Sequence, residues 1–220
     1  MAIPDIEIAR YADDDELVAA TRADGLARVR VARPDRVRVV LGRGSRADIE
    51  LHLDACRADG VEVVRRPGGG CAVVLDPGNV TVAIALPVRG IGDNPRWFAA
   101  ITAWMIGALA DSGVPGVETD GISDLVITGR KIGGSCIHRA PGVLHYAASL
   151  LVSPDVSLIE RYLRPPPREP KYRAGRTHRD FVGAIEALVG RNLGANFADT
   201  LEGALRERVA QRSHDSSDFS

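Results

Sequence analysis

The 220-residue sequence contains little cysteine and no long apolar run. Its three cysteines, Cys56, Cys71 and Cys136, are odd in number and lack the paired spacing of metal ligands, so neither a disulfide framework nor a zinc site is expected. No segment approaches the roughly 18–20 apolar residues of a membrane-spanning helix, and the N-terminal segment lacks the pattern of a signal peptide. These absences favour a cytoplasmic protein that does not enter a membrane.

The chain also lacks an excess of charge of either sign, because its formal net charge is −1. Neither nucleic acid nor an anionic membrane surface is therefore an expected partner. All but two of the 28 basic residues are arginine, a bias that favours a GC-rich genome as its cause. The two lysines, Lys131 and Lys171, stand out because the chain otherwise uses arginine for positive charge.

The pattern of apolar residues predicts an α+β fold, since strand-like runs and helical runs do not alternate regularly. Strands are expected at 6–11, 27–32, 36–42, 61–66, 72–76, 79–86 and 142–152. Helices are expected at 14–23, 46–58, 94–112, 154–163, 178–189 and 197–211. Residues 1–212 are predicted to form one domain, with no C-terminal accessory domain, and the polar residues 213–220 a disordered tail.

Two hairpins are predicted. Residues 27–32 and 36–42 alternate between Arg and Val and are joined by Arg33-Pro34-Asp35, a link of hairpin length. Residues 123–134 fit a hairpin with Thr128-Gly129 as its two-residue turn. In that hairpin Val126 faces Lys131, and alternation places Asp124 beside Lys131 on the same face.

The segment RRPGGG, residues 65–70, lies between two predicted strands. Consecutive glycines let backbone N–H groups converge on an anion, and the paired Arg65 and Arg66 add donors suited to phosphate or carboxylate. By itself the segment is more typical of a glycine-rich turn beside two surface arginines. It matches neither the P-loop nor the dinucleotide-binding fingerprint.

Asp124 and Lys131 form the second candidate pair. A carboxylate beside an ammonium keeps the ammonium charged and aimed, which suits an electrostatic stabiliser better than a nucleophilic amine. Taken alone, the pair is more typical of a surface ion pair at a hairpin tip, which stabilises little.

Together the two segments resemble the lipoate–protein ligase A family, within the superfamily that also contains biotin ligases. Its usual pattern is RR-x-x-GGG-x-V-x-HD-x-GN followed by NDL…GRK-[IV]-x-G-S-A, and this chain carries RRPGGG…LDPGN and then SDLVITGRKIGGS. The segment 144–166 resembles a further family stretch, so that the likeness covers roughly residues 1–190. The resemblance implies a biotinyl/lipoyl protein ligase-like catalytic domain with mixed or antiparallel sheets flanked by helices.

The resemblance also implies an ATP-dependent ligase that activates lipoate as lipoyl-AMP and transfers it to an acceptor lysine, with Mg²⁺ required beside ATP. Lys131 would be the catalytic lysine. The residues that would bind ATP and the acyl-adenylate are Arg65, Arg66, Gly69, Gly70, Cys71, Ala72, Val73, Val74, Asn79, Asp124 and Lys131. Val39, Leu41 and Val73 would line the acyl pocket, and no side chain is assigned to a metal.

Departures from the family pattern leave alternatives open. Cys71 stands at the third glycine, Leu75 replaces the histidine of HD-x-GN, and Ser123 replaces the asparagine of NDL. An octanoyltransferase with a cysteine nucleophile and an acyl carrier protein donor is the main alternative. Alternation along an uninterrupted strand would place Cys136 opposite Lys131, which leaves Cys71 as the better candidate. A biotin ligase fits less well, and a non-catalytic lipoyl-binding homologue is a further alternative.

The expected partner is a lipoyl acceptor: an E2 domain, a glycine-cleavage H protein or an H-like lipoyl carrier. Many family members carry an accessory domain, so a separate accessory subunit is a further expected partner, and a monomer is the default. Residues 171–181 form a basic run with Tyr172 and Phe181, which fits a contact surface for an acidic acceptor, a lid, or a solvated loop with packed aromatics. His138 and His145 are expected to be structural or exposed rather than general bases.

Overall fold

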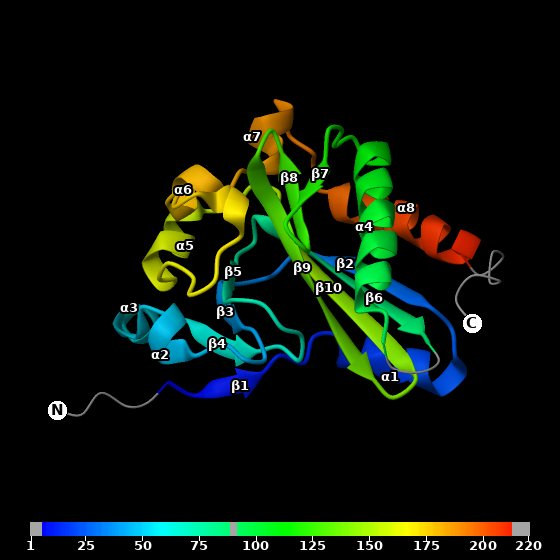
Figure 1. Ribbon diagram of the computed structural model, residues 1–220, viewed down its shortest axis with the longest axis horizontal. Helices are drawn as coiled ribbons and strands as arrows, with labels where there is room; N and C mark the ends of the chain where they lie inside the picture. Colours follow the sequence, from blue (N-terminus) through cyan, green and yellow to red (C-terminus); the bar gives the residue numbers. More distant parts are fainter. Residues whose placement is uncertain (1–5, 89–91, 213–220) are drawn as a thin grey trace.

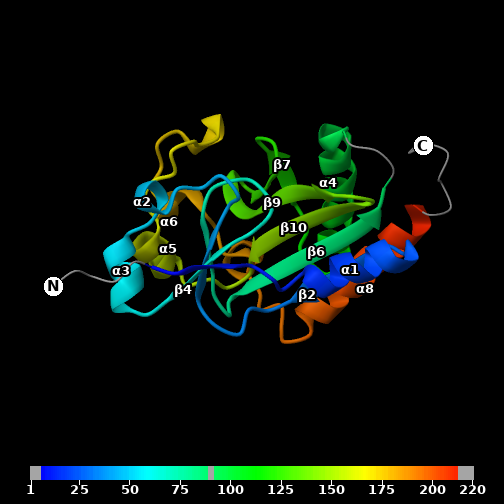
Figure 2. The same ribbon diagram turned by 90° about the horizontal axis from the view of Figure 1, so that it is seen from below.

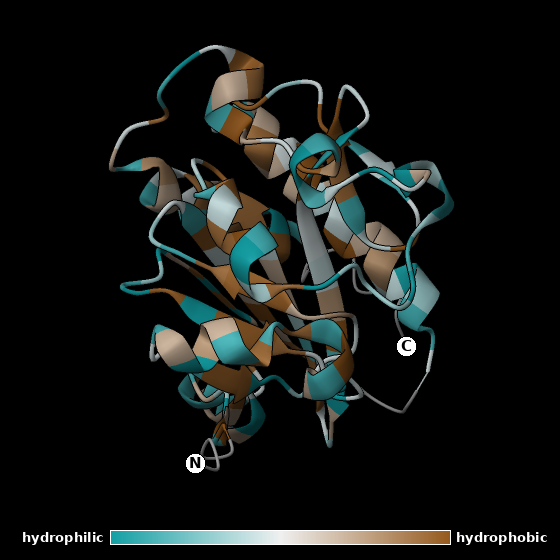
Figure 3. Ribbon diagram, turned by 90° about the vertical axis from the view of Figure 1, so that its left-hand side faces the viewer, coloured by the Kyte–Doolittle hydropathy of each residue, from teal (hydrophilic) through white to brown (hydrophobic). Residues whose placement is uncertain are grey.

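The computed structural model describes residues 6–88 and 92–212. The predicted disordered tail at 213–220 lies outside these residues. The described part of the chain folds into two sheets with helices around them, so the α+β prediction is confirmed (Figure 1). In Figure 3 the apolar colouring concentrates on the strands, whereas the surrounding helices mix apolar and polar residues.

The smaller sheet has the strand order β1-β4-β3-β5. Its strands are β1 (Ile8–Arg10), β3 (Arg38–Leu41), β4 (Glu62–Arg65) and β5 (Val73–Leu75). β4 pairs in parallel with both β1 and β3, and β5 pairs antiparallel with β3. The link from β3 to β4 contains α2 (Ala47–Glu50) and α3 (Leu53–Ala58). One helix was predicted there; it is broken because Leu51 forms a bridge with Leu163 and the His52 N–H donates to the Tyr162 carbonyl.

The larger sheet has the order β2-β6-β10-β9-β8-β7 and is antiparallel throughout. Its strands are β2 (Arg28–Ala32), β6 (Asn79–Pro87), β7 (Glu118–Asp120), β8 (Asp124–Ile127), β9 (Arg130–Ala140) and β10 (Val143–Leu151). The central strands β6, β9 and β10 are the longest, so the sheet offers a broad face on each side.

The predicted hairpin of residues 27–32 and 36–42 is wrong, because β2 and β3 belong to different sheets. β2 pairs with β6 and shows the expected alternation, with Val29 and Val31 buried. All four residues of β3 are buried, since β3 has β4 and β5 on its two sides and cores on both faces. The short link around Pro34 therefore crosses from one sheet to the other.

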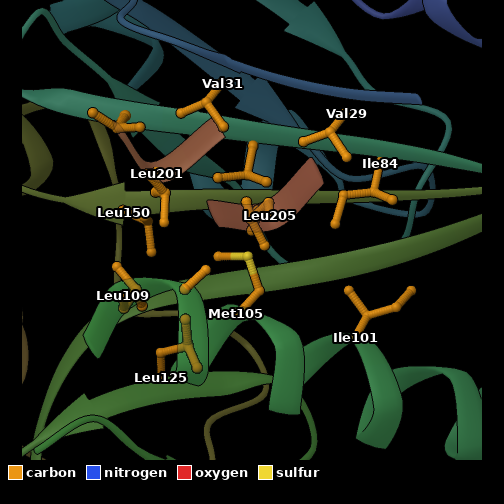
Figure 4. Packing of buried hydrophobic residues seen from close by; sticks show 14 of the residues in the cluster. Val29, Val31, Ile84, Ile101, Met105, Leu109, Leu125, Leu150, Leu201 and Leu205 are labelled. Atoms are coloured by element: carbon orange, nitrogen blue, oxygen red, sulfur yellow. The ribbon is translucent and has the colours of Figure 1, made fainter. Parts of the chain in front are cut away.

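One face of the larger sheet packs against α4 (Asn94–Asp111) and α8 (Phe197–Arg212). Figure 4 shows Ile101, Met105 and Leu109 of α4 pointing towards the strands, as do Leu201 and Leu205 of α8. The apolar side of α4 is thus part of the core. No helix of the described residues is long and apolar enough to cross a membrane.

Along β10, the even-numbered residues from Leu144 to Leu150 pack in the core with α4 and α8. The residues between them, such as His145, Ala147 and Ser149, face the other side of the sheet. The helix α1 (Asp15–Asp24) begins on this second face, since the side chain before it, Asp14, pairs with His145. Figure 2 shows α1 and α8 next to the edge strand β2. The second face is therefore left partly uncovered between α1 and the smaller sheet.

The chain after β10 contains α5 (Val156–Tyr162), the 3-10 helix η1 (Lys171–Arg173), α6 (His178–Phe181) and α7 (Ile185–Val189). A single helix was predicted at 178–189; it is interrupted because the Gly183 N–H donates to the Lys131 carbonyl and Val182 bridges to Lys131. These bonds hold residues 164–182, called the cap segment below, against the start of β9.

Candidate functional site

A cavity of about 330 Å³ lies between the two sheets, beneath the cap segment. Its walls come from the glycine-rich loop after β4, from β3 and β5, and from the second face of β9 and β10. These segments are distant in the sequence, and the packing of one sheet on the other brings them together (Figure 1).

Arg66 organises the glycine-rich loop from inside the cavity. Its guanidinium donates to the carbonyls of Gly69 and Cys71, each at 2.8 Å, and to that of Val40 at 3.1 Å. The loop is folded tightly over β3, because a Cβ built on Gly42 would lie 1.9 Å from the Gly70 carbonyl oxygen. None of the ion pairs among the described residues includes Arg66, so its charge is available to an anion in the cavity.

Two of the predicted ligand-binding residues in this loop lie outside the cavity lining. Arg65 points the other way, and its Nη1 donates to the carbonyls of Gly42 and Ser45 at 2.8 Å each. Gly69 is exposed and uses its carbonyl to accept from Arg66. Arg65 and Gly69 therefore shape the loop, whereas Arg66, Gly70 and Cys71 line the cavity.

Glu50, which the sequence did not single out, fixes the far side of the same loop. Its side chain is buried, and Oε2 accepts from the Ala72 N–H at 2.7 Å and from the Ser45 hydroxyl at 3.1 Å. A lone acid within a predicted helix gives no signal of such a role. Its contacts hold Ala72 and Val73, two of the predicted residues, in the cavity wall.

Lys131 and Asp124 meet as predicted. The turn at Thr128 and Gly129 has φ values of 48° and 73°, which are typical of a tight hairpin turn, and Val126 pairs with Lys131. Lys131 Nζ lies 2.7 Å from Asp124 Oδ1, and both side chains line the cavity. The other oxygen of Asp124 accepts from the Tyr172 hydroxyl at 2.8 Å.

A β-bulge places Cys136 on the same side as Lys131, so the expectation of opposite sides is wrong. Leu125 pairs with Gly133 while Val126 pairs with Lys131, which leaves Ile132 as an extra residue in β9. Ile132 packs in the core, and beyond it the parity of the strand is reversed. A Cβ built on Gly134 would lie 3.0 Å from Lys131 Nζ, and Cys136 lines the cavity.

Burial raises the pKa of the thiols of Cys71 and Cys136 above the ordinary value. Cys56, in the core of the smaller sheet, is shifted in the same direction for the same reason. A raised pKa keeps a thiol protonated at neutral pH, which is the opposite of what an attacking thiolate needs.

Three other predicted residues do not line the cavity. Asn79 is 1% exposed and accepts from the Asp76 N–H at 2.8 Å, so it holds the turn before β6. Val39 and Leu41 are fully buried in the core cluster that also contains Val74 and Phe181, and neither lines the cavity. Val40, the residue between them, lines the cavity instead. Val73 and Val74 line the cavity as expected.

The cap segment adds positive charge to the lining. Arg164, Arg168 and Arg173 join Arg66 and Lys131, against the three acids Asp14, Glu50 and Asp124. Arg173 is only 5% exposed, and burial lowers the pKa of its guanidinium. An excess of cations in a concave site favours an anionic ligand. The aromatics of the predicted basic run pack inward, since the rings of Tyr172 and Phe181 lie 5.1 Å apart.

The cavity has a second polar end, which the sequence did not predict. Tyr11, Asp14 and His145 line it, and His145 Nε2 lies 3.2 Å from Asp14 Oδ2 in a buried pair. His145 is thus buried at the end of the cavity, 5% exposed. His145 and Leu151 are six residues apart on β10, so the lined face extends for about 20 Å. Among the described residues no cluster of three or more His, Cys, Asp or Glu side chains could hold a metal ion.

Comparison with known families gives one matching model, the lipoyl protein ligase A/B catalytic domain, over residues 11–204. A lipoate–protein ligase of Streptococcus pyogenes is 32% identical over 149 residues, which are 67% of this chain and 43% of the relative. A putative lipoate-protein ligase A of Aeropyrum pernix is 32% identical over 154 residues, 69% of this chain and 56% of the relative. The chain thus spans about half the length of these relatives.

Two solved structures share the fold. A bi-partite lipoate protein ligase of Thermoplasma acidophilum, described with its E2 lipoyl domain, superimposes with a TM-score of 0.74 at 21% identity, covering 91% of this chain and 76% of the other. A lipoate-protein ligase A bound with ATP gives 0.73 at 18% identity, covering 96% and 86%. The expected fold is therefore confirmed.

Proposed function

The chain belongs to the lipoyl protein ligase A/B catalytic-domain family, and from that premise we propose that it is an ATP-dependent lipoate–protein ligase. The carboxylate of lipoate attacks the α-phosphorus of ATP and releases pyrophosphate, which leaves lipoyl-AMP. The ε-amine of an acceptor lysine then attacks the acyl carbonyl and releases AMP. The placement of the Lys131–Asp124 pair and Arg66 in one cavity carries the proposal.

Lys131 acts in this reaction as a fixed positive charge. The Asp124 carboxylate 2.7 Å away holds the ammonium in place, so that it stabilises the negative charge that builds up when carboxylate and phosphate approach. Arg66 adds a second cation beside the glycine-rich loop, and Arg168 and Arg173 of the cap segment add others. Donors that are already in place when the charge develops stabilise the transition state more than the bound substrates.

The apolar part of the cavity suits the acyl chain. Val40, Val73 and Val74 from the smaller sheet and Ala147 on β10 all line it. The carboxylate would lie at Lys131 and the chain would extend along β9 and β10 towards Asp14 and His145. Pockets for small molecules commonly combine such an apolar wall with a few convergent polar groups.

Mg²⁺ enters the proposal as part of the substrate, the magnesium complex of ATP. The described residues contain no group of acidic or histidine side chains arranged for a metal. Mg²⁺ commonly keeps most of its ligands from phosphate oxygens and water, which fits this arrangement. The acceptor in our proposal is a lipoyl domain or an H-type carrier protein, and the structural relative described with its E2 lipoyl domain supports this class.

The test is mass spectrometry of an apo lipoyl-domain acceptor after incubation with the protein, Mg²⁺ and lipoate, with and without ATP. We expect a mass increase of one lipoyl group only with ATP, and none with Lys131→Ala. Pyrophosphate release without acceptor measures the first half-reaction separately. If neither half-reaction occurs, with or without an added accessory subunit, the chain is a lipoyl-binding homologue and the proposal fails.

An octanoyltransferase with a thiol nucleophile is the second candidate, and the bulge in β9 favours it because Cys136 shares the cavity with Lys131. The raised pKa of the Cys136 thiol weighs against it. Incubation of the acceptor with octanoyl-acyl carrier protein and no ATP separates the two functions. Octanoylation that is lost in Cys136→Ser would establish the transferase in place of the ligase.

A further inference from the structure

Tyr172 connects the cap segment to Lys131 through Asp124. The residue lies in η1, and its hydroxyl donates to Asp124 Oδ2 at 2.8 Å. The other oxygen of the same carboxylate lies 2.7 Å from Lys131 Nζ. A continuous chain of hydrogen bonds therefore runs from the cap segment through Asp124 to Lys131.

The position of Tyr172 depends on closure of the cap segment. Arg176 donates to the Tyr172 carbonyl at 2.8 Å and to the Gly129 carbonyl at 3.1 Å. Gly129 lies in the turn of the β8–β9 hairpin, which carries Lys131. On the same hairpin, Arg130 donates to the Val182 carbonyl at 2.9 Å through Nε. The Tyr172 ring also packs on Phe181. The hydroxyl therefore reaches Asp124 only while the cap segment lies on the hairpin.

From this geometry we propose that Tyr172 is a positioning residue, which makes the alignment of Lys131 depend on closure of the cap segment over the cavity. The inference rests on the proposed function, in which Lys131 stabilises developing charge. A carboxylate with one oxygen held by a hydroxyl presents its other oxygen in one direction. The long and flexible lysine side chain then has a fixed partner, and less ordering remains when substrates bind.

The protonation state of Tyr172 is consistent with this role. The pKa of the Tyr172 phenol is raised well above its ordinary value, mainly by burial and in addition by the nearby Asp124 carboxylate. The hydroxyl therefore keeps its proton throughout the pH range of an enzyme assay and remains a donor to Asp124.

The chain offers a matched control for removal of the hydroxyl. Tyr162 donates to Asp59 Oδ2, also at 2.8 Å, and lies outside the cavity lining. Tyr172→Phe and Tyr162→Phe each remove one hydroxyl from one carboxylate. Only the first breaks a contact in the chain that leads to Lys131.

The first measurement is the steady-state rate of pyrophosphate release with lipoate and ATP. We expect Tyr172→Phe to lower kcat about tenfold, the value of one hydrogen bond to a charged group, and to change KM for either substrate by about twofold or less. Tyr162→Phe should retain the kcat of the unmodified protein. In an Asp124→Asn background, Tyr172→Phe should have no further effect on kcat, because the linking carboxylate is gone. Equal loss of kcat in both tyrosine variants would show a purely structural role and overturn the proposal.

The second measurement does not depend on turnover. Because the chain has only two lysines, protein labelled with ¹⁵N-lysine gives one side-chain ammonium signal from Lys131 and one from exposed Lys171. We expect slow proton exchange at Lys131 in the unmodified protein and in Tyr162→Phe. Exchange in Tyr172→Phe should accelerate towards the rate in Asp124→Asn. An unchanged Lys131 signal in Tyr172→Phe would overturn the positioning role, whereas a changed signal in a protein that forms no adenylate would refute only the proposed function.

Discussion

Arg65 and Arg66 are adjacent in the chain, yet their guanidinium groups serve different purposes. Arg65 holds the turn of Gly42 to Ser45 through backbone carbonyls, and Arg66 faces the cavity. Arg65→Ala should lower the free energy of unfolding by about 1–3 kcal/mol, because a charged group loses its hydrogen bonds to buried carbonyls. Arg66→Ala also removes hydrogen bonds to backbone carbonyls and should destabilise the protein, and it alone should weaken ATP binding, at least about tenfold. Urea denaturation and calorimetric titration with ATP measure the two effects, and weakened ATP binding in Arg65→Ala but not in Arg66→Ala would contradict the assignment.

Lys131 is the residue on which the proposed chemistry depends most. Lys131→Ala should lower the rate of adenylate formation about 10²–10³-fold, the usual effect of losing one preorganised stabilising group. Lys171→Ala, at an exposed position outside the cavity lining, serves as the control for loss of a lysine and should retain the rate. A Lys131→Ala protein that keeps its rate of pyrophosphate release would exclude the electrostatic role.

The Lys131–Asp124 pair and Arg66 could be predicted from the sequence because each depends on a short local pattern, a two-residue turn or a glycine-rich loop. The sequence could not show whether Val39 or Val40 lines the cavity. Both are fully or nearly fully buried, so hydrophobicity does not distinguish them, and only the packing of each face of β3 decides. The turn-holding position of Asn79, outside the cavity lining, could not be predicted either, since a turn-holding asparagine and a ligand-binding one look alike in sequence.

Among the elements, the β8–β9 hairpin carries a strained turn. Thr128 has φ of 48°, a conformation that a β-branched residue adopts at a cost and that asparagine tolerates. Thr128→Asn should therefore raise the free energy of unfolding by about 0.5–1 kcal/mol. Thr119→Asn, at an exposed position within β7, should give no increase, because that strand position has no positive φ. Urea denaturation of both variants gives the comparison.

The bulge in β9 and the broken helices were beyond prediction. Ile132 has an apolar side chain at a position where simple alternation already allows one, so nothing in the sequence indicates an extra residue. The breaks at Leu51 and at Val182 arise from bridges to residues far away in the chain. The separation of β2 from β3 is also a tertiary effect, since each finds its partners in a different sheet.

At the scale of the whole molecule, two histidines next to the cavity link stability to pH. Burial lowers the pKa of His138 and of His178, and nearby positive groups act in the same direction: His145 and Arg43 for His138, Arg173 for His178. Below pH 6.5 the unfolded chain then binds more protons than the folded one, so the free energy of unfolding falls as the pH decreases towards the folded-state pKa values. Thermal unfolding between pH 7.5 and 5.5 should show this loss. The double variant His138→Gln/His178→Gln should show a shallower slope, and an unchanged slope would contradict the assignment.

The overall architecture followed from the family resemblance and from the irregular order of strands and helices, and the comparisons confirm both family and fold. The placement of the cap segment could not be predicted from the sequence. Residues 164–182 contain several prolines and arginines with little apolar periodicity. Their position on the β8–β9 hairpin is set by the bridge of Val182 to Lys131 and by hydrogen bonds from the side chains of Arg130 and Arg176. The cavity as a whole therefore depends on contacts that no single segment encodes.

Under the proposed function, in which an activated acyl group is made in the cavity, the near absence of lysine has a chemical consequence. An acyl-adenylate reacts with any neutral amine that reaches it, whereas arginine, which stays protonated, is not such a nucleophile. The cations that line the cavity are all arginine except Lys131, and Asp124 holds that ammonium in an ion pair. A wall built in this way protects the protein from acylating itself, so that the intermediate persists until an amine from the acceptor enters.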